Sequence, residues 1–170
     1  MKAVMISIQP KWCELIASGK KTVEVRKTMP NIATPFKCYI YCTQGKLKDI
    51  GITSHSTYEN RQKVIGEFVC DELSCGYWIS PFTDYLQRQS CLSYDEICDY
   101  ANEKPLFAWH ISDLVIYDEP KELWEFIKPC NHENDCCTCD RYDYIGHRCY
   151  NEFTRPPQSW CYVEERSEGK

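Results

Sequence analysis

The sequence lacks any apolar run that approaches the roughly 20 residues of a membrane-spanning helix. Its first ten residues also lack the long apolar stretch and small-residue cleavage site of a secretory signal. We find no internal repeat. We therefore expect a soluble, cytoplasmic protein without a membrane partner, whose thiols stay reduced.

An overall positive charge, which is typical of nucleic-acid-binding proteins, is also missing, because the net charge is -5. The charge is unevenly distributed, however. Residues 1–50 hold nine Lys or Arg against three Asp or Glu, whereas residues 51–170 hold eleven against twenty-two. The basic first third could face phosphate groups, or it could be an ordinary solvated surface.

The length of 170 residues and a hydrophobic content of 43% predict one folded domain. Apolar runs and alternating patterns predict strands at 3–8, 22–26, 36–42, 63–70, 106–111, 114–117 and 160–163. Helices are expected at 10–18, 93–101 and 118–128. This mixture predicts an α+β fold, in which short helices flank a small β-barrel.

Local signals mark two of these elements. Ser93 and Glu96 have the spacing of a capping box, and Leu92 and Ile97 have that of a hydrophobic staple, so a helix should begin there. Gly66, inside a strand pattern, indicates a bulge or a close approach of another backbone.

Charged residues gather where the first helix gives way to a strand, in the sequence Gly-Lys-Lys-Thr-Val-Glu-Val-Arg at residues 19–26. Glu24 and Arg26 are two residues apart, so both should lie on one strand face. Lys21 offers a compact cation for phosphate, and Arg26 a planar fork for a phosphate, a carboxylate or a base edge. Glu24 could accept from a base amino group or act as a general base. Alternatively, Glu24 and Arg26 only brace the strand.

Gly19, Lys21, Glu24 and Arg26 match all four positions of G-x-K-x-x-E-x-R, so the chain resembles the ASCH domain family, a branch of the PUA-like superfamily. The segments Ser7–Pro10, Ala108–Ile111 and Arg155–Cys161 look similar to ASCH proteins common in phage and prophage genomes. The resemblance implies a PUA-like barrel with a cleft that is floored by Lys21, Glu24 and Arg26. It also implies RNA or a nucleotide as the ligand.

One enzymatic branch that the motif resembles hydrolyses acylated cytidines and carries Thr, its proposed nucleophile, where this chain has Glu24. The resemblance thus leaves open an enzyme in which Lys21 and Glu24 are catalytic, as a nucleoside amidohydrolase or a ribonuclease. A carboxylate can also attack covalently. A third possibility is a phage-encoded protein-interaction module that docks through the acidic remainder of the chain.

Three further side chains are candidates for ligand binding. Trp109 and His110 are neighbours on an expected strand, so one should point inward and the other outward. Trp78 lies in an irregular aromatic segment and could stack on a base. Each of the three could instead be a packing residue.

The chain has thirteen cysteines, an odd number that does not fit a disulfide framework. Seven are spread through the first hundred residues and are expected to be small buried hydrophobes. Those seven are Cys13, Cys38, Cys42, Cys70, Cys75, Cys91 and Cys98.

Five cysteines crowd into residues 130–149. Cys136 and Cys139 have the spacing of two thiolates on one metal ion, and Cys130 and Cys149 could complete a tetrahedral zinc site. The spare potential ligands are Cys137, His132 and His147. No H-x-E arrangement accompanies them, which argues against the catalytic zinc of a cytidine deaminase.

The domain organisation follows from these patterns. Residues 1–128 together with 156–165 should form the barrel. Residues 129–155 should form a Cys-rich insertion that a structural zinc ion folds, and residues 166–170 should be a frayed tail.

This insertion leads to the first testable prediction. Metal analysis of the purified protein should find about one zinc ion per chain, because four thiolates fill one tetrahedral site. A protein purified without zinc or any other thiolate-bound metal would contradict the prediction.

Overall fold

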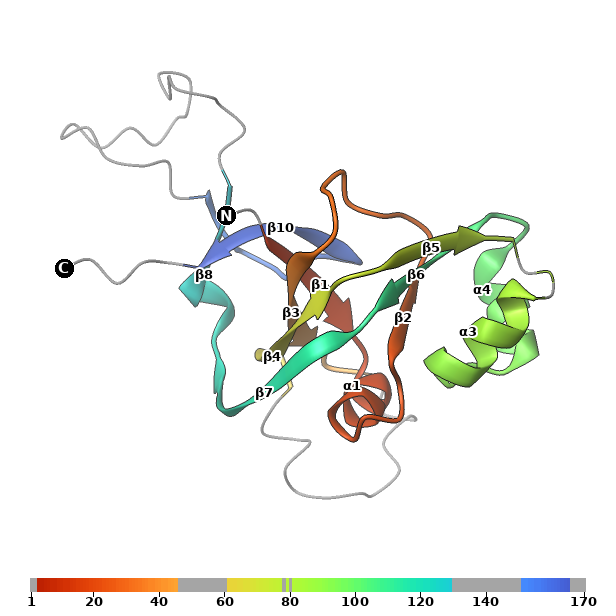
Figure 1. The fold of residues 1–170 in the computed structure, drawn as a ribbon. Helices are drawn as coiled ribbons and strands as arrows, with labels where there is room; N and C mark the ends of the chain where they lie inside the picture. Colours follow the sequence, from red (N-terminus) through yellow and green to blue (C-terminus); the bar gives the residue numbers. More distant parts are fainter. Residues whose placement is uncertain (1–2, 46–60, 78, 80, 130–150, 166–170) are drawn as a thin grey trace, which may run out of the picture.

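A computed structural model describes residues 3–45, 61–77, 79, 81–129 and 151–165. In these residues, ten β-strands form a seven-stranded and a three-stranded sheet. Three α-helices and a one-turn 3-10 helix accompany the sheets (Figure 1). The expected mixed α and β composition is therefore confirmed.

The larger sheet has the strand order β7-β4-β3-β1-β10-β8-β9. At its centre, β1 (Ala3–Ile8) pairs in parallel with β3 (Phe36–Cys42) and antiparallel with β10 (Trp160–Glu165). All six residues of β1 are buried, which explains why five of them, all but Ser7, are apolar. The remaining strands are β4 (Lys63–Cys70), β7 (Ser112–Lys121), β8 (Phe126–Lys128) and β9 (Asn151–Glu152).

The smaller sheet has the order β2-β6-β5 and consists of β2 (Val23–Arg26), β6 (Leu106–His110) and β5 (Leu73–Gly76). Helices α3 (Phe82–Ser90) and α4 (Tyr94–Ala101) lie beside it (Figure 1). They share a hydrophobic core with this sheet, built on buried side chains from β2, β6 and both helices.

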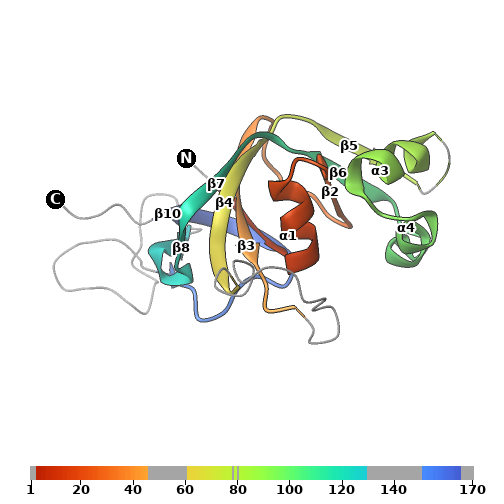
Figure 2. The same cartoon turned by 90° about the horizontal axis from the view of Figure 1, so that it is seen from below.

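Helix α1 (Pro10–Ala17) follows directly from β1. Its first residue is proline, whose missing N–H costs nothing at this position. It ends before Gly19, which adopts the left-handed conformation (φ 72°) that glycine tolerates. Seen from below, α1 lies between β3 and β2, where the two sheets approach each other (Figure 2).

The described strands do not close into a barrel, since each sheet has two free ends in its strand order. The cysteine prediction holds for Cys13, Cys38, Cys42 and Cys70, which are buried, but is wrong for Cys75, which is exposed. Cys91 and Cys98 are partly exposed.

Both local signals are confirmed. Ser93 caps α4, and the Ser93 and Glu96 side chains exchange hydrogen bonds with each other's backbone N–H. A methyl group built on Gly66 would meet the Val115 carbonyl oxygen at 2.4 Å, so the backbone of β7 approaches it closely.

The helix expected at 118–128 is wrong. Residues 118–121 continue β7, because this strand pairs with β4 as far as Lys121, opposite Val64. One turn of 3-10 helix (Leu123–Glu125) and β8 follow. The sequence favours a helix here because Asp118 could cap it and Pro120 suits its first turn. Tertiary pairing has overridden that local signal. The sequence analysis also missed β5 and α3.

The C-terminal end of the expected insertion joins the larger sheet. Strand β9 pairs with β8, and Phe153 is buried beside Phe126 in the core. Among the described residues, no helix combines the length and apolar character that a membrane span requires.

Candidate functional site: a charged cleft between the two sheets

A cavity of about 530 Å³ opens where the end of β1, helix α1, strand β2 and residues 156–158 meet. Its walls combine charged, amide, aromatic and proline side chains. They are Ser7, Ile8, Gln9, Trp12, Lys21, Glu24, Val25, Arg26, Thr43, Leu92, Tyr100, Pro156, Pro157 and Gln158. Lys21, Glu24 and Arg26, which the sequence placed together in a cleft, all line this cavity.

The alternation of β2 aims its charged residues at the cavity. Val23 and Val25 pack into the core with α3 and α4. Glu24 and Arg26 therefore lie on the opposite face, because successive side chains on a strand point to opposite sides. The four residues of β2 thus contribute two valines to the hydrophobic core and two charged side chains to the floor of the cleft.

Glu24 is the centre of this floor. Its Oε1 lies 3.0 Å from Arg26 Nη2, and its Oε2 lies 3.3 Å from Lys21 Nζ. The exposed fractions of the three side chains are only 8% for Glu24, 11% for Arg26 and 3% for Lys21. One buried carboxylate therefore balances two nearly buried cations.

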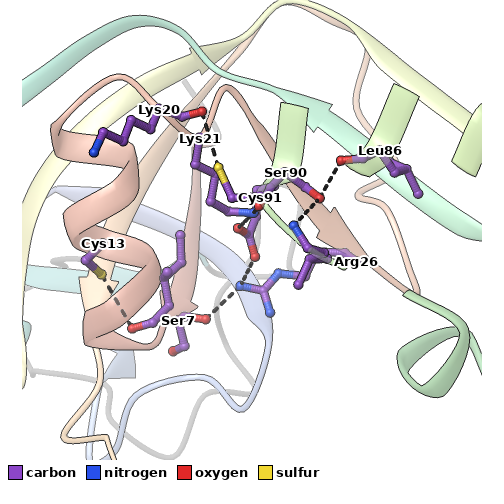
Figure 3. Close-up of polar contacts among 11 residues, drawn as sticks. Ser7, Cys13, Lys20, Lys21, Arg26, Leu86, Ser90 and Cys91 are labelled. Carbon is purple, nitrogen blue, oxygen red and sulfur yellow. Dashed lines mark hydrogen bonds and ion pairs between the residues drawn. The ribbon is translucent and has the colours of Figure 1, made fainter. Parts of the chain in front are cut away.

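Backbone carbonyls hold the two cations in place. Lys21 Nζ donates to the Ser90 carbonyl at 2.9 Å, and Arg26 Nη2 donates to the Ser7 carbonyl at 2.7 Å (Figure 3). Lys21 Nζ also lies 5.1 Å from the centre of the Trp12 ring, within the range of a cation–π interaction. These contacts join β2 to β1, α1 and the end of α3.

Two atoms of this floor keep unused hydrogen-bonding capacity. Glu24 Oε2 and Arg26 Nε are buried without a hydrogen-bond partner. Lys21 is near enough to Oε2 for an ion pair, but the arrangement is not a hydrogen bond. These two atoms are therefore shielded from water and lack hydrogen bonds among the described residues, although Oε2 is ion-paired with Lys21.

Most of the buried polar and charged residues lie at this site. In the described parts of the chain, five polar or charged residues are buried: Ser7, Lys21, Glu24, Thr83 and Ser90. Ser7, Lys21 and Glu24 line the cavity, and Ser90 accepts the hydrogen bond from Lys21. Buried polar groups are costly unless they are paired, so this clustering is typical of a functional site.

Two aromatic rings in the cavity wall each have a lysine beside them. Lys11 Nζ lies 4.1 Å from the centre of the Trp12 ring, and Lys27 Nζ lies 4.9 Å from the centre of the Tyr100 ring. Both rings are partly exposed. The wall therefore combines two partly exposed aromatic rings with lysine cations that lie over them.

The other expected ligand-binding residues lie elsewhere. Trp109 is completely buried against Phe36 and Trp160, so it is part of the core. His110 points the other way, as alternation requires, and its Nδ1 lies 2.6 Å from Asp71 Oδ1. This hydrogen bond lowers the pKa of Asp71. Neither Trp109 nor His110 lines the cavity.

Trp78 and the four expected zinc ligands, Cys130, Cys136, Cys139 and Cys149, lie outside the described residues. The zinc site therefore stays a prediction. In the part of the chain that the structure does describe, no three His, Cys, Asp or Glu side chains form a metal-binding group.

The sequence analysis did not assign Trp12, Tyr100 or Pro156–Gln158 to the site. Trp12 and Tyr100 lie in predicted helices, where an aromatic residue is most simply a packing group. The sequence signal that could have indicated Pro156–Gln158 was the resemblance of residues 7–10 and 155–161 to ASCH proteins.

The fold and site together define a mixed α and β domain with a polar cleft of about 530 Å³ between its two sheets. The ASCH domain model matches residues 6–130, well over half of the chain, and the chain therefore belongs to the ASCH family, within the PUA-like group. ASCH domains are associated with RNA binding.

The fold is also similar to crystal structures of the ASCH protein of Zymomonas mobilis. That protein is 24% identical, with a TM-score of 0.56 over 71% of this chain and 73% of the other. Two single mutants of it give TM-scores of 0.55 at 25% identity and 0.53 at 24% identity. The first covers 71% of this chain and 74% of the mutant, and the second covers 72% and 77%. No curated protein sequence matches the chain.

The central position of Glu24 leads to a prediction about stability. Replacing Glu24 with alanine leaves Lys21 and Arg26 nearly buried without their counter-charge, and should lower the free energy of unfolding by about 3–5 kcal/mol. Urea denaturation measures this change.

The exposed pair of Lys11 and Glu96 provides the control, since its atoms lie 3.4 Å apart and the side chains are 50% and 45% exposed. Lys11→Ala should cost about 0–1 kcal/mol. If Lys11→Ala and Glu24→Ala lowered the free energy of unfolding equally, Glu24 would not be the counter-charge that stabilises Lys21 and Arg26.

Proposed function

We propose that this ASCH protein binds RNA or a nucleotide in the cleft floored by Lys21, Glu24 and Arg26. The observation that carries the proposal is the buried charged floor at the base of a cavity of about 530 Å³. Cavities of roughly 300–1,000 Å³ are typical of small-ligand sites. A nucleotide supplies both the polar edges and the flat ring that the walls suit.

The chemistry of the walls supports the same proposal. When a ligand that enters the cleft displaces the groups that cover them, Arg26 Nε can donate to a base acceptor and Glu24 Oε2 can accept from a base amino group. Trp12 and Tyr100 offer stacking surfaces, which single-stranded nucleic acids use. Lys11 and Lys27 lie over these rings, so each is close enough to meet the phosphate of a nucleotide that stacks there.

Binding of a fluorescently labelled single-stranded RNA octamer, measured by anisotropy, tests the proposal. Affinity should fall as salt rises from about 50 to 200 mM, because phosphate contacts release counterions. Arg26→Ala should abolish most of the binding. Tyr100→Leu should weaken it at least about fivefold, since one stacked base is lost.

Tyr94→Leu is the matched control, because Tyr94 is exposed on the same helix and does not line the cavity. It should bind like the wild type. No binding at low salt, or identical binding by wild type, Arg26→Ala and Tyr100→Leu, would refute the proposed site.

A second candidate function is hydrolysis in the same cleft, of an acylated nucleoside or of RNA. One observation favours it: Glu24 Oε2 has no hydrogen-bond partner and lies 3.3 Å from the Lys21 ammonium. Such a carboxylate can act as a base or nucleophile while the lysine stabilises developing negative charge.

Incubation with acylcytidines and with RNA checks this candidate. Wild type should show turnover that Lys21→Ala and Glu24→Gln lose, with Glu24→Gln preserving the shape of the side chain. Turnover by both variants at the wild-type rate would remove these residues from any mechanism, and absence of turnover by the wild type would leave binding as the function.

Three expectations from the sequence stay proposals of this kind. They are a phage-type origin, a zinc-bound Cys-rich insertion and a protein-interaction role for the acidic part of the chain. The cleft itself is formed by described residues of the two sheets, the helices beside them and residues 156–158, so the proposed binding does not depend on these three expectations.

A further inference from the structure

Two segments that the sequence analysis noted only for their resemblance, at residues 7–10 and 155–161, meet at the mouth of the cleft. The Ser7 N–H donates to the Ser159 carbonyl at 2.8 Å, and Ser7 Oγ donates to the Pro157 carbonyl at 2.6 Å. These bonds extend the pairing of β1 with β10, in which Ile6 lies opposite Trp160. Residues 156–158 are thereby held as a wall of the cavity.

Ser7 connects this wall to the charged floor. Its carbonyl oxygen accepts the hydrogen bond from Arg26 (Figure 3). Its N–H donates to the Ser159 carbonyl, and its hydroxyl donates to the Pro157 carbonyl. Ser7 is 7% exposed, so these bonds are shielded from water. A change at Ser7 should therefore shift the wall relative to Arg26.

Two glutamine side chains line the cavity at this junction, Gln9 and Gln158. Gln9 lies two residues after Ser7 and Gln158 one residue before Ser159, so the two glutamines flank the hydrogen bond between Ser7 and Ser159. Both glutamines are exposed, and neither side chain makes a hydrogen bond to the described residues. Gln9 precedes α1, but its amide does not cap that helix.

The chemistry of these amides differs from that of the floor. An amide offers a donor and an acceptor side by side, so it can pair with a heterocycle edge that carries the same two groups. Lysine contacts to phosphate are insensitive to sequence. The base-reading atoms of Arg26 and Glu24 are buried, so the exposed amides of Gln9 and Gln158 are the more accessible groups for discrimination among bases.

The wall also lies outside the part of the chain that defines the family. The ASCH model matches residues 6–130, whereas Pro156–Gln158 follow it by more than twenty residues. The charged floor belongs to the matched region. Half of the amide pair is thus contributed by a segment that the family model does not include.

We propose that Gln9 and Gln158 determine which nucleobase the cleft accepts, and that Ser7 is the positioning residue that sets their wall. This inference rests on the proposed function and deepens it: the ligand is recognised by a base edge with adjacent donor and acceptor groups, in addition to its charge. The floor supplies affinity, and the amide pair supplies selectivity.

Binding of the RNA octamers A8, C8 and U8 to the full chain at one salt concentration tests the inference. Wild type should prefer one of them by about tenfold or more, as a bidentate amide contact allows. Gln158→Ala and Gln9→Ala should narrow this ratio to about threefold or less. Ser7→Ala should narrow it too, through loss of the bond to Pro157.

Gln87→Ala is the matched control, because Gln87 lies on α3 and does not line the cavity. It should keep the wild-type ratio. Ratios are compared because a loss of folded protein lowers all three affinities equally and leaves their ratio unchanged.

The outcomes distinguish a failure of base selectivity from a failure of RNA binding in the cleft. Wild type that binds all three octamers equally, or glutamine variants that keep the wild-type ratio, would overturn the inference while RNA binding stands. Failure of the wild type to bind any octamer would overturn the proposed function, and the inference would fall with it.

Discussion

The cleft depends on one carboxylate. Glu24 holds Arg26 and Lys21 within 3.0 and 3.3 Å, and all three side chains are almost completely withdrawn from water. Apolar residues of similar volume would stabilise such a position equally well or better, so stability alone does not explain a buried charged trio. The proposed ligand would account for the trio, because its polar groups could pair with Glu24 Oε2 and Arg26 Nε, which have no hydrogen-bond partner among the described residues.

The rest of the fold serves to place this trio. The two valines of β2 anchor the strand in the core under α3 and α4, which turns Glu24 and Arg26 toward the second sheet. The fully buried strand β1 then presents Ser7 at its end, where it joins the Arg26 floor to the wall at 156–158. The site is therefore assembled from both ends of the chain. Its trio contains two cations and one anion, although the whole chain has a net charge of -5.

The sequence predicted what is encoded locally. The strand from Val23 to Arg26 and the capping box at Ser93 follow from patterns of a few residues, and the structure confirms both. The helix expected after Asp118 failed because pairing with β4, a long-range interaction, extends β7 through those residues. Long-range hydrogen bonds from Ser7 also hold the wall at 156–158, so no local pattern could have placed Gln158 in the same cavity as Gln9.

The central claim is that the buried floor is where the ligand is bound, and the side-chain N–H of Arg26 reports on it directly. Its Nε is buried without a hydrogen-bond partner. In a nitrogen-15 NMR titration with the preferred RNA octamer, the Arg26 Nε–H resonance should shift strongly and exchange more slowly with water, because it gains an acceptor. An unchanged Arg26 resonance, at RNA concentrations that shift signals elsewhere in the protein, would show that the ligand binds at another surface.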